Sequence, residues 1–213
     1  MLLAIDTATF RASIALHDGD QIVGECTWEA VNRHTVTLMV RIESLMESAG
    51  LRAADLTALA VCIGPGSYTG VRIGVAVAQG LALSRGLPLV GLPTLDILAA
   101  AQPPDERPLY AIFSAGRRRI GYARYRWAEG WRAESEVELG TWAEFVAALE
   151  PPAIVVGELS PEGRDRLQAI EGIELPPPAR HLRRAGYLAD LGWAALRAGA
   201  ESRPAMVKPR YLR

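Results

Sequence analysis

Two short segments in the first half of the chain carry residue types that could hold a phosphate group. The first follows an opening apolar run and contains Asp6, Thr7 and Thr9. In nucleotide phosphotransferases built from two similar α/β lobes, an acid and a hydroxyl at the end of the first strand face the phosphates. The same side chains can instead form hydrogen bonds within a turn. The sequence leaves both interpretations open.

The second segment is a glycine-rich run, GPGSYTGVRIG, from Gly64 to Gly74. It lies between an apolar run and a helical pattern, so free backbone N–H groups gather where a helix begins, and such groups bind anions. Gly64, Gly66, Ser67 and Thr69 are therefore candidate phosphate or nucleotide contacts. Ser67 and Thr69 can equally cap the helix, because their hydroxyls accept hydrogen bonds from its first N–H groups. The sequence does not choose between these roles.

Three better-defined motifs do not fit the glycine-rich run. A P-loop ends in Gly-Lys-Ser/Thr, but the only lysine of the chain is Lys208. A dinucleotide fingerprint has the spacing GxGxxG, whereas these glycines are spaced GxGxxxG. A nucleophile elbow has glycines two positions before and after its serine, where Pro65 and Thr69 stand. None of these motifs is assigned.

Small residues recur at every fourth position from Gly70 to Ala82 and form a stripe on one helix face. Such a stripe lets a second helix approach closely. That helix belongs either to another chain or to the segment 35–49, and the sequence does not decide. The residues expected at a partner-binding surface are Leu38, Ile42, Leu45, Met46, Gly70, Val71, Gly74, Val75, Ala78, Leu81 and Ala82.

Hydrophobic patterning places these segments in an α/β framework. Alternating residues predict an opening antiparallel meander. A fully apolar run then predicts a strand buried on both faces, followed by a helix. The elements expected in the first half are strands at 2–7, 12–19 and 21–30, a helix at 35–49, a strand at 56–64, a helix after the glycine-rich run, a strand at 88–91 and a helix at 94–101.

The second half repeats this order of elements after a proline-rich linker at 102–108. We therefore expect two similar α/β lobes with a cleft between them, spanning 1–103 and 104–213. The first would carry partner-docking helices, and the C-terminal tail could return to it. The elements expected in the second half are strands at 108–114, 120–127, 132–139 and 153–157 and helices after Thr141, after Ser160 and at 186–199.

Composition excludes several classes of protein. Cys26 and Cys62 offer no zinc spacing and no disulfide framework, and no apolar run approaches the roughly 18 residues of a membrane span. We expect a cytoplasmic protein. The net charge of −1 gives no general attraction to nucleic acid. The arginines at 117–119 and at 180, 183 and 184 are a weak hint of phosphate contact.

Three motifs together resemble a known family. IDTAT near the start, GPGSYTGVRIG in the middle and KPRYLR at the end are similar to the TsaB (YeaZ) family of bacterial tRNA threonylcarbamoyladenosine biosynthesis. The resemblance covers the full length and implies the two-lobed actin-like ATPase fold. It also implies a non-catalytic subunit that pairs with TsaD, which transfers the threonylcarbamoyl group to N6 of the adenosine beside the anticodon in tRNAs reading codons that start with A.

The resemblance carries further expectations about partners and cofactors. TsaE joins the pair, tRNA binds only within the complex, and the chain can form a homodimer. No cofactor of its own is expected, although ATP or ADP could sit at the complex interface. Within TsaD-like proteins two histidines four apart on one helix can bind a metal, but here His34 is followed four positions later by Leu38. No metal site and no catalytic residue are therefore expected.

One position departs from the family pattern, and one alternative function stays open. Family members commonly begin the second lobe with Asp-Ala-Gly/Arg-Arg, where this chain has Ser114-Ala115-Gly116-Arg117. The missing carboxylate weakens the case for nucleotide binding by the lone chain. The alternative is an active nucleotide-dependent phosphotransferase or ATPase of the actin-like superfamily, which would use Asp6 and the glycine-rich run.

Overall fold

The computed structural model describes the backbone of residues 1–30 and 34–212, and their side chains except those of residues 34–36. The chain divides into two compact units. The first comprises Met1–Ile97 and Arg184–Tyr211, and the second comprises Leu98–Arg183 with the end of the chain. The division lies within a helix, α3 (Thr94–Ala100), rather than at the predicted boundary of 103 and 104.

The first unit is built on a five-stranded mixed sheet with the order β3-β2-β1-β4-β5. The predicted antiparallel meander is confirmed, and β4 and β5 then add parallel strands beyond β1. Every residue of β1 is buried, which agrees with a central strand covered on both faces. The strands are β1 (Leu2–Asp6), β2 (Arg11–His17), β3 (Ile22–Glu29), β4 (Ala58–Gly64) and β5 (Leu89–Pro93).

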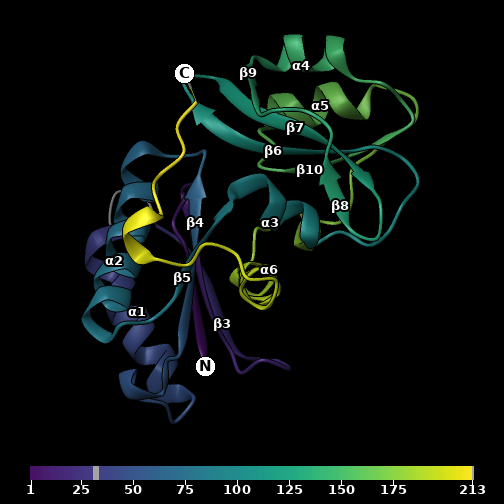
Figure 1. Ribbon diagram of the computed structural model, residues 1–213. Helices are drawn as coiled ribbons and strands as arrows, with labels where there is room; N and C mark the ends of the chain where they lie inside the picture. The colour runs from purple at the N-terminus through teal and green to yellow at the C-terminus, as the bar shows by residue number, and fades with distance from the viewer. Residues whose placement is uncertain (31–33, 213) are drawn as a thin grey trace. The chain divides into compact units, whose positions relative to one another are not determined.

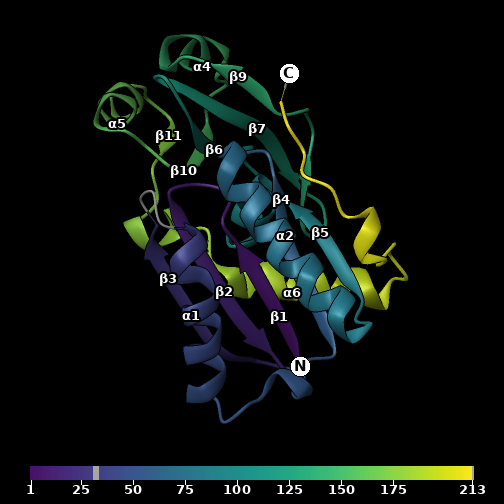
Figure 2. The same ribbon diagram turned by 90° about the vertical axis from the view of Figure 1, so that its left-hand side faces the viewer.

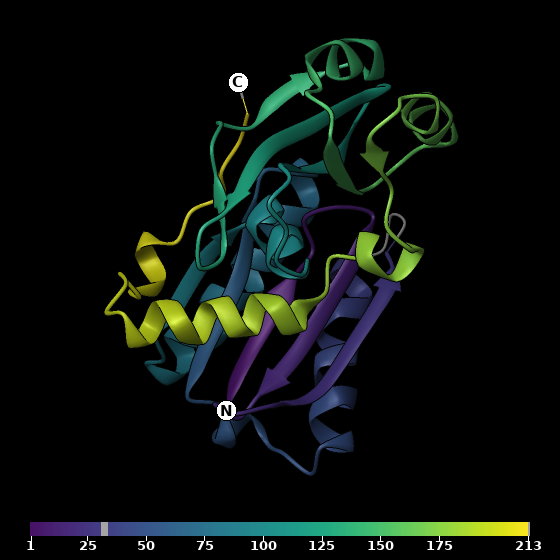
Figure 3. The same ribbon diagram turned by 90° about the vertical axis from the view of Figure 1, so that its right-hand side faces the viewer.

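Helices cover both faces of this sheet. Helices α1 (His34–Ser48) and α2 (Tyr68–Arg85) lie side by side on one face, as Figure 2 shows. Helix α6 (Ala185–Arg197) crosses the opposite face (Figure 3). Two short 3₁₀ turns complete the unit, at Ala53–Asp55 and Pro204–Met206.

Helix α6 corrects the predicted extent of the second lobe. Its side chains Leu188 and Ala189 are fully buried in the core of the first unit. Gly192 comes so close to the sheet that a Cβ there would lie 2.7 Å from the Cβ of Ala60. The meander and β4 need an apolar cover on this face, and α6 from the returning chain end supplies it.

The second unit holds a six-stranded sheet with the order β11-β10-β6-β7-β8, to which β9 adds by pairing with β7. Helices α4 and α5 pack against each other in the same unit (Figure 1). Aromatic side chains fill the core, with the Phe145 ring against Tyr110, Tyr122 and Trp142. The elements are β6 (Leu109–Gly116), β7 (Arg119–Trp127), β8 (Trp131–Ala133), β9 (Glu138–Gly140), α4 (Trp142–Ala148), β10 (Ala153–Gly157), α5 (Pro161–Gln168), β11 (Ile173–Glu174) and a 3₁₀ turn at Pro178–His181.

The predicted strand at 132–139 is two short strands instead. β8 and β9 pair with different parts of β7, and between them the Ser135 hydroxyl accepts a hydrogen bond from the Arg124 backbone N–H. The predicted helix caps agree with the structure, because a cap depends on residues close together in the chain. Thr141 and Glu144 form the predicted capping box, and Ser160 caps α5 as expected.

Candidate functional site

The structure brings together the two segments that the sequence marked as phosphate-binding candidates. The Thr7 hydroxyl donates a 2.7 Å hydrogen bond to the Gly70 carbonyl oxygen, and the Ser67 N–H donates a 2.6 Å bond to the Ala8 carbonyl oxygen. The turn between β1 and β2 is therefore bonded directly to the glycine-rich run and to the start of α2.

Glycines in the run are required by this close approach. A Cβ at Gly66 would clash with the Ala8 carbonyl oxygen, and one at Gly70 would clash with the Thr7 carbonyl oxygen. The run thus contains glycine where another backbone passes within contact distance. This explains its composition without a bound ligand.

Most of the candidate polar side chains form hydrogen bonds within the chain. Asp6 is fully buried, and its Oδ1 accepts a hydrogen bond of 2.9 Å from the Ala8 N–H, which is a local turn contact. Thr9 is also buried, and its hydroxyl oxygen accepts a 3.4 Å bond from the Arg11 N–H. Ser67 caps α2, because its hydroxyl accepts the Gly70 N–H at 3.2 Å. The geometry matches the turn and capping roles that the sequence had left open.

Exposure divides the candidate phosphate contacts further. Gly64 is buried and Gly66 is half-buried, whereas Ser67 and Thr69 are exposed. Among the described residues, no three of His, Cys, Asp and Glu gather as metal ligands would. The side chain of His34 lies outside the described residues. Phosphate contact at this run stays a prediction.

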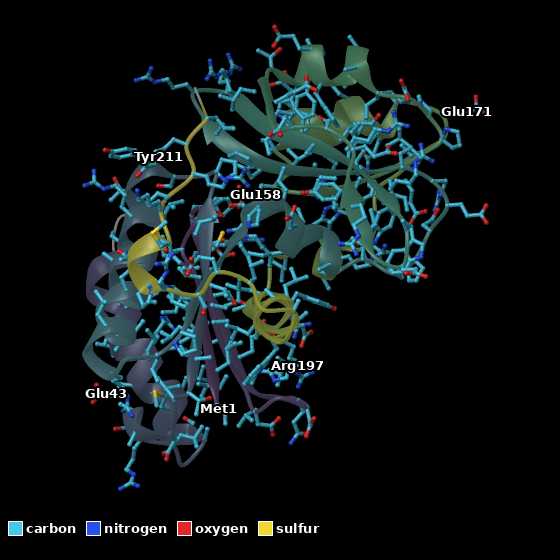
Figure 4. The ribbon with its side chains drawn as sticks, viewed as in Figure 1. Met1, Glu43, Glu158, Glu171, Arg197 and Tyr211 are labelled. Atoms are coloured by element: carbon cyan, nitrogen blue, oxygen red, sulfur yellow. The ribbon has the colours of Figure 1, made fainter. Side chains whose placement is uncertain are left out.

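The C-terminal tail, for which the sequence analysis allowed a return to the first lobe, meets the same loop. The Arg210 N–H donates a 2.7 Å hydrogen bond to the Ile63 carbonyl oxygen at the end of β4. The ring of Tyr211, labelled in Figure 4, lies 5.1 Å from that of Tyr68 between centroids. The three motifs that carried the family resemblance therefore converge at one end of the first sheet.

Gln79 on α2 binds a part of the tail that comes earlier in the chain. Its side-chain NH₂ donates hydrogen bonds of 2.9 Å to the Pro204 carbonyl oxygen and 3.0 Å to the Val207 carbonyl oxygen. Gln79 is the one polar residue in the stretch 73–83 of α2, and this interruption was the sequence signal for the contact. We call residues 203–211 the C-terminal strap.

The small-residue stripe does not face another chain. Gly70, Gly74, Ala78 and Ala82 are all buried, and a Cβ at Gly74 would clash with the Thr7 hydroxyl oxygen. The stripe packs on its own sheet and on the β1–β2 turn, where oxygen atoms of Thr7 leave no room for a Cβ at Gly70 or Gly74. The same correction applies to five further predicted docking residues, which are buried in the core of the first unit: Leu38, Ile42, Met46, Val71 and Val75.

Only the outward faces of the two predicted docking helices are available to a partner. Of the predicted residues, Leu45 and Leu81 are partly buried against the core. The described apolar side chains that these helices expose are different ones, and they include Val40 on α1, which is 62% exposed, and Leu83 on α2, which is 64% exposed. Ala76 on α2 is exposed as well. Docking of a partner by α1 and α2 stays a prediction, but the side chains that the sequence analysis expected at the docking surface are buried or partly buried.

The two arginine clusters differ in their surroundings. Arg180, Arg183 and Arg184 have acidic partners, at Glu174, Glu158 and Glu25 respectively. In contrast, Arg117, Arg118 and Arg119 are exposed at a hairpin between β6 and β7. Ser114, the departure from the family pattern, is exposed in the same hairpin, and its N–H donates to Glu158 Oε2 at 2.9 Å.

Comparison with known proteins agrees with this geometry. The model of the TsaD family, described as tRNA N6-adenosine threonylcarbamoyltransferase, matches residues 26–197. The tRNA threonylcarbamoyladenosine biosynthesis protein TsaB of Bacillus subtilis (strain 168) is 30% identical over 197 residues, which cover 90% of this chain and 86% of that protein. TsaB of Escherichia coli (strain K12) is 34% identical over 172 residues, covering 80% and 68%.

A solved structure extends the likeness to the fold. YeaZ from Pseudomonas aeruginosa superposes with a TM-score of 0.75 at 24% identity, covering 98% of this chain and 99% of that one. The predicted fold class, a two-lobed α/β fold of the actin-like ATPase type, is confirmed. No helix among the described residues is long and apolar enough to cross a membrane. On the family match and on the extent of identity with the Bacillus subtilis protein, the chain belongs to the TsaB (YeaZ) family.

Proposed function

We propose that this protein is a non-catalytic subunit of tRNA threonylcarbamoyladenosine biosynthesis that pairs with a TsaD-type threonylcarbamoyltransferase. Its relatives in Bacillus subtilis and Escherichia coli are named as tRNA threonylcarbamoyladenosine biosynthesis proteins. The match to the TsaD family model supports a place for this chain beside a TsaD-type subunit.

The observation that carries the non-catalytic role is the use of the candidate residues inside the fold. Leu38, where a second metal-binding histidine would be needed, is a fully buried core residue. The Thr7 hydroxyl donates to Gly70, and Asp6 accepts from Ala8. The Thr7 bond joins the turn to the glycine-rich run, and the Asp6 bond lies within the turn, so both support the fold.

The partner surface in this proposal is the outward face of α1 and α2. Val40 and Leu83 expose apolar side chains there, and burying an apolar side chain of that size contributes about 1.5–3 kcal/mol. Ala76 lies exposed on the same helix as Leu83, so a partner helix can approach α2 closely at that position. In the absence of the partner the same face can pair two copies of the chain.

The test replaces Ala76 with arginine and measures association with the cognate TsaD-type subunit by light scattering. A long charged side chain on the outward face should abolish the one-to-one complex while the circular dichroism of the lone chain stays unchanged. The matched control is Ala169→Arg, at an exposed alanine after α5, which should bind normally. Full association of the Ala76→Arg variant would contradict this surface.

The remaining members of the assembly follow from the same proposal. TsaE joins the pair, tRNA is bound within the complex, and any ATP or ADP is held at the junction with the partner. Threonylcarbamoyl transfer by the purified complex, measured with and without this chain, tests the role itself. Undiminished transfer by the TsaD-type subunit alone would refute it.

A further inference from the structure

The hairpin between β6 and β7 has an unusual loop. Gly116 pairs with Arg119, so the loop consists of Arg117 and Arg118 only. Both have positive φ, at 51° and 62°. Two-residue loops with positive φ at both positions are type I′ turns, which match the twist of the flanking strands.

Arginine is a poor choice for this conformation. Positive φ brings the Cβ of an L-residue close to backbone atoms, so asparagine followed by glycine is the strongly preferred pair in such turns. Here both positions hold the longest cationic side chain. Backbone strain retained at an exposed loop points to a function of the side chains themselves.

The two guanidinium groups are also free of partners within the described chain. Both residues are exposed, and neither forms a hydrogen bond or an ion pair with any described residue. The neighbouring Arg119 differs, because it lies near enough to Glu144 to help lower the pKa of that carboxyl, after the larger effect of the Thr141 hydrogen bonds. Unpaired charge is therefore concentrated at the tip.

We propose that Arg117 and Arg118 contact the phosphate backbone of the tRNA held by the complex, an inference that rests on the proposed function. A guanidinium presents a planar fork of donors that fits a phosphate group. The net charge of the chain is −1, so the molecule as a whole does not attract RNA and a local pair of cations must supply the contact. Arginines elsewhere that are paired with carboxylates cannot do so without breaking those pairs.

The experiment compares three variants at the loop within the complex of this chain and its TsaD-type partner. R117N/R118G removes both charges and installs the preferred turn pair. R117Q/R118Q removes the charges and keeps the strain, and R117K/R118K keeps both charges. R132Q/R166Q is the matched control, since it removes two positive charges from exposed positions of the same unit. The probe is an unmodified tRNA transcript that reads a codon starting with A.

The expected result is that stability and RNA binding move in opposite directions. R117N/R118G should melt a few degrees above the unsubstituted chain, because its residues suit the turn. Both charge-free variants should bind the transcript at least tenfold more weakly. Their slope of log affinity against log salt should be less steep by about 1.4–1.8, for two phosphate contacts at ~0.7–0.9 each. The lysine variant and the control should keep a near-normal slope.

Three results would overturn the inference, and they are distinguishable. Unchanged transcript binding by R117N/R118G in an intact complex would refute the phosphate contact alone. Weaker association of that variant with the protein partner, measured by light scattering without RNA, would assign the loop to an acidic protein surface instead. Failure of the unsubstituted chain to form the complex would refute the proposed function, and this inference with it.

Discussion

At the scale of single residues, two glycines on α2 have opposite environments. A Cβ at Gly74 would meet the Thr7 hydroxyl oxygen, whereas one at Gly80 would have no atom within 4 Å. We expect Gly74→Ala to lower the free energy of unfolding by about 1–3 kcal/mol through overpacking. The matched Gly80→Ala should raise it by roughly 0.5–1 kcal/mol, because alanine favours the helix. Urea denaturation of both variants checks this, and equal stabilities would show that Gly74 is not tightly packed.

At the scale of elements, the C-terminal strap depends on α2 for its position. Replacing Gln79 with leucine removes both donors to the Pro204 and Val207 carbonyl oxygens. This should lower the free energy of local opening of the strap by about 1–2 kcal/mol. We expect faster amide hydrogen exchange across 203–211 and unchanged protection within β1. Gln168→Leu, at an exposed end of α5, is the control and should leave the strap protected. Unaltered exchange in the Gln79 variant would mean that the strap is held by other contacts.

At the scale of the whole molecule, the two units differ in what each needs in order to fold. Residues 98–183 contain their own aromatic core around Phe145, so this fragment should give a dispersed NMR spectrum on its own. A chain ending at residue 183 lacks α6, whose Leu188 and Ala189 are fully buried in the first unit. Its first unit should therefore unfold or aggregate. A chain ending at residue 211 is the control and should keep both units. A folded first unit without α6 would contradict the packing described above.

Local sequence signals determined much of this protein. Strand and helix patterns, the Ser67, Thr141 and Ser160 caps and the family resemblance all depend on residues close together in the chain or on motifs of fixed spacing. Such signals survive because the physical interactions behind them are local.

Only the tertiary structure decided what each surface faces. The stripe ending at Ala82 could have met a partner chain, α1 or the sheet, and periodicity is the same in all three cases. The return of α6 and of the strap to the first unit, and the division at Ile97, depend on contacts between residues far apart in the chain. Several elements could cover a given apolar face. A local pattern therefore does not show which of them buries it. The sequence by itself thus determined the elements and the family, and packing determined which face of each element is free to act.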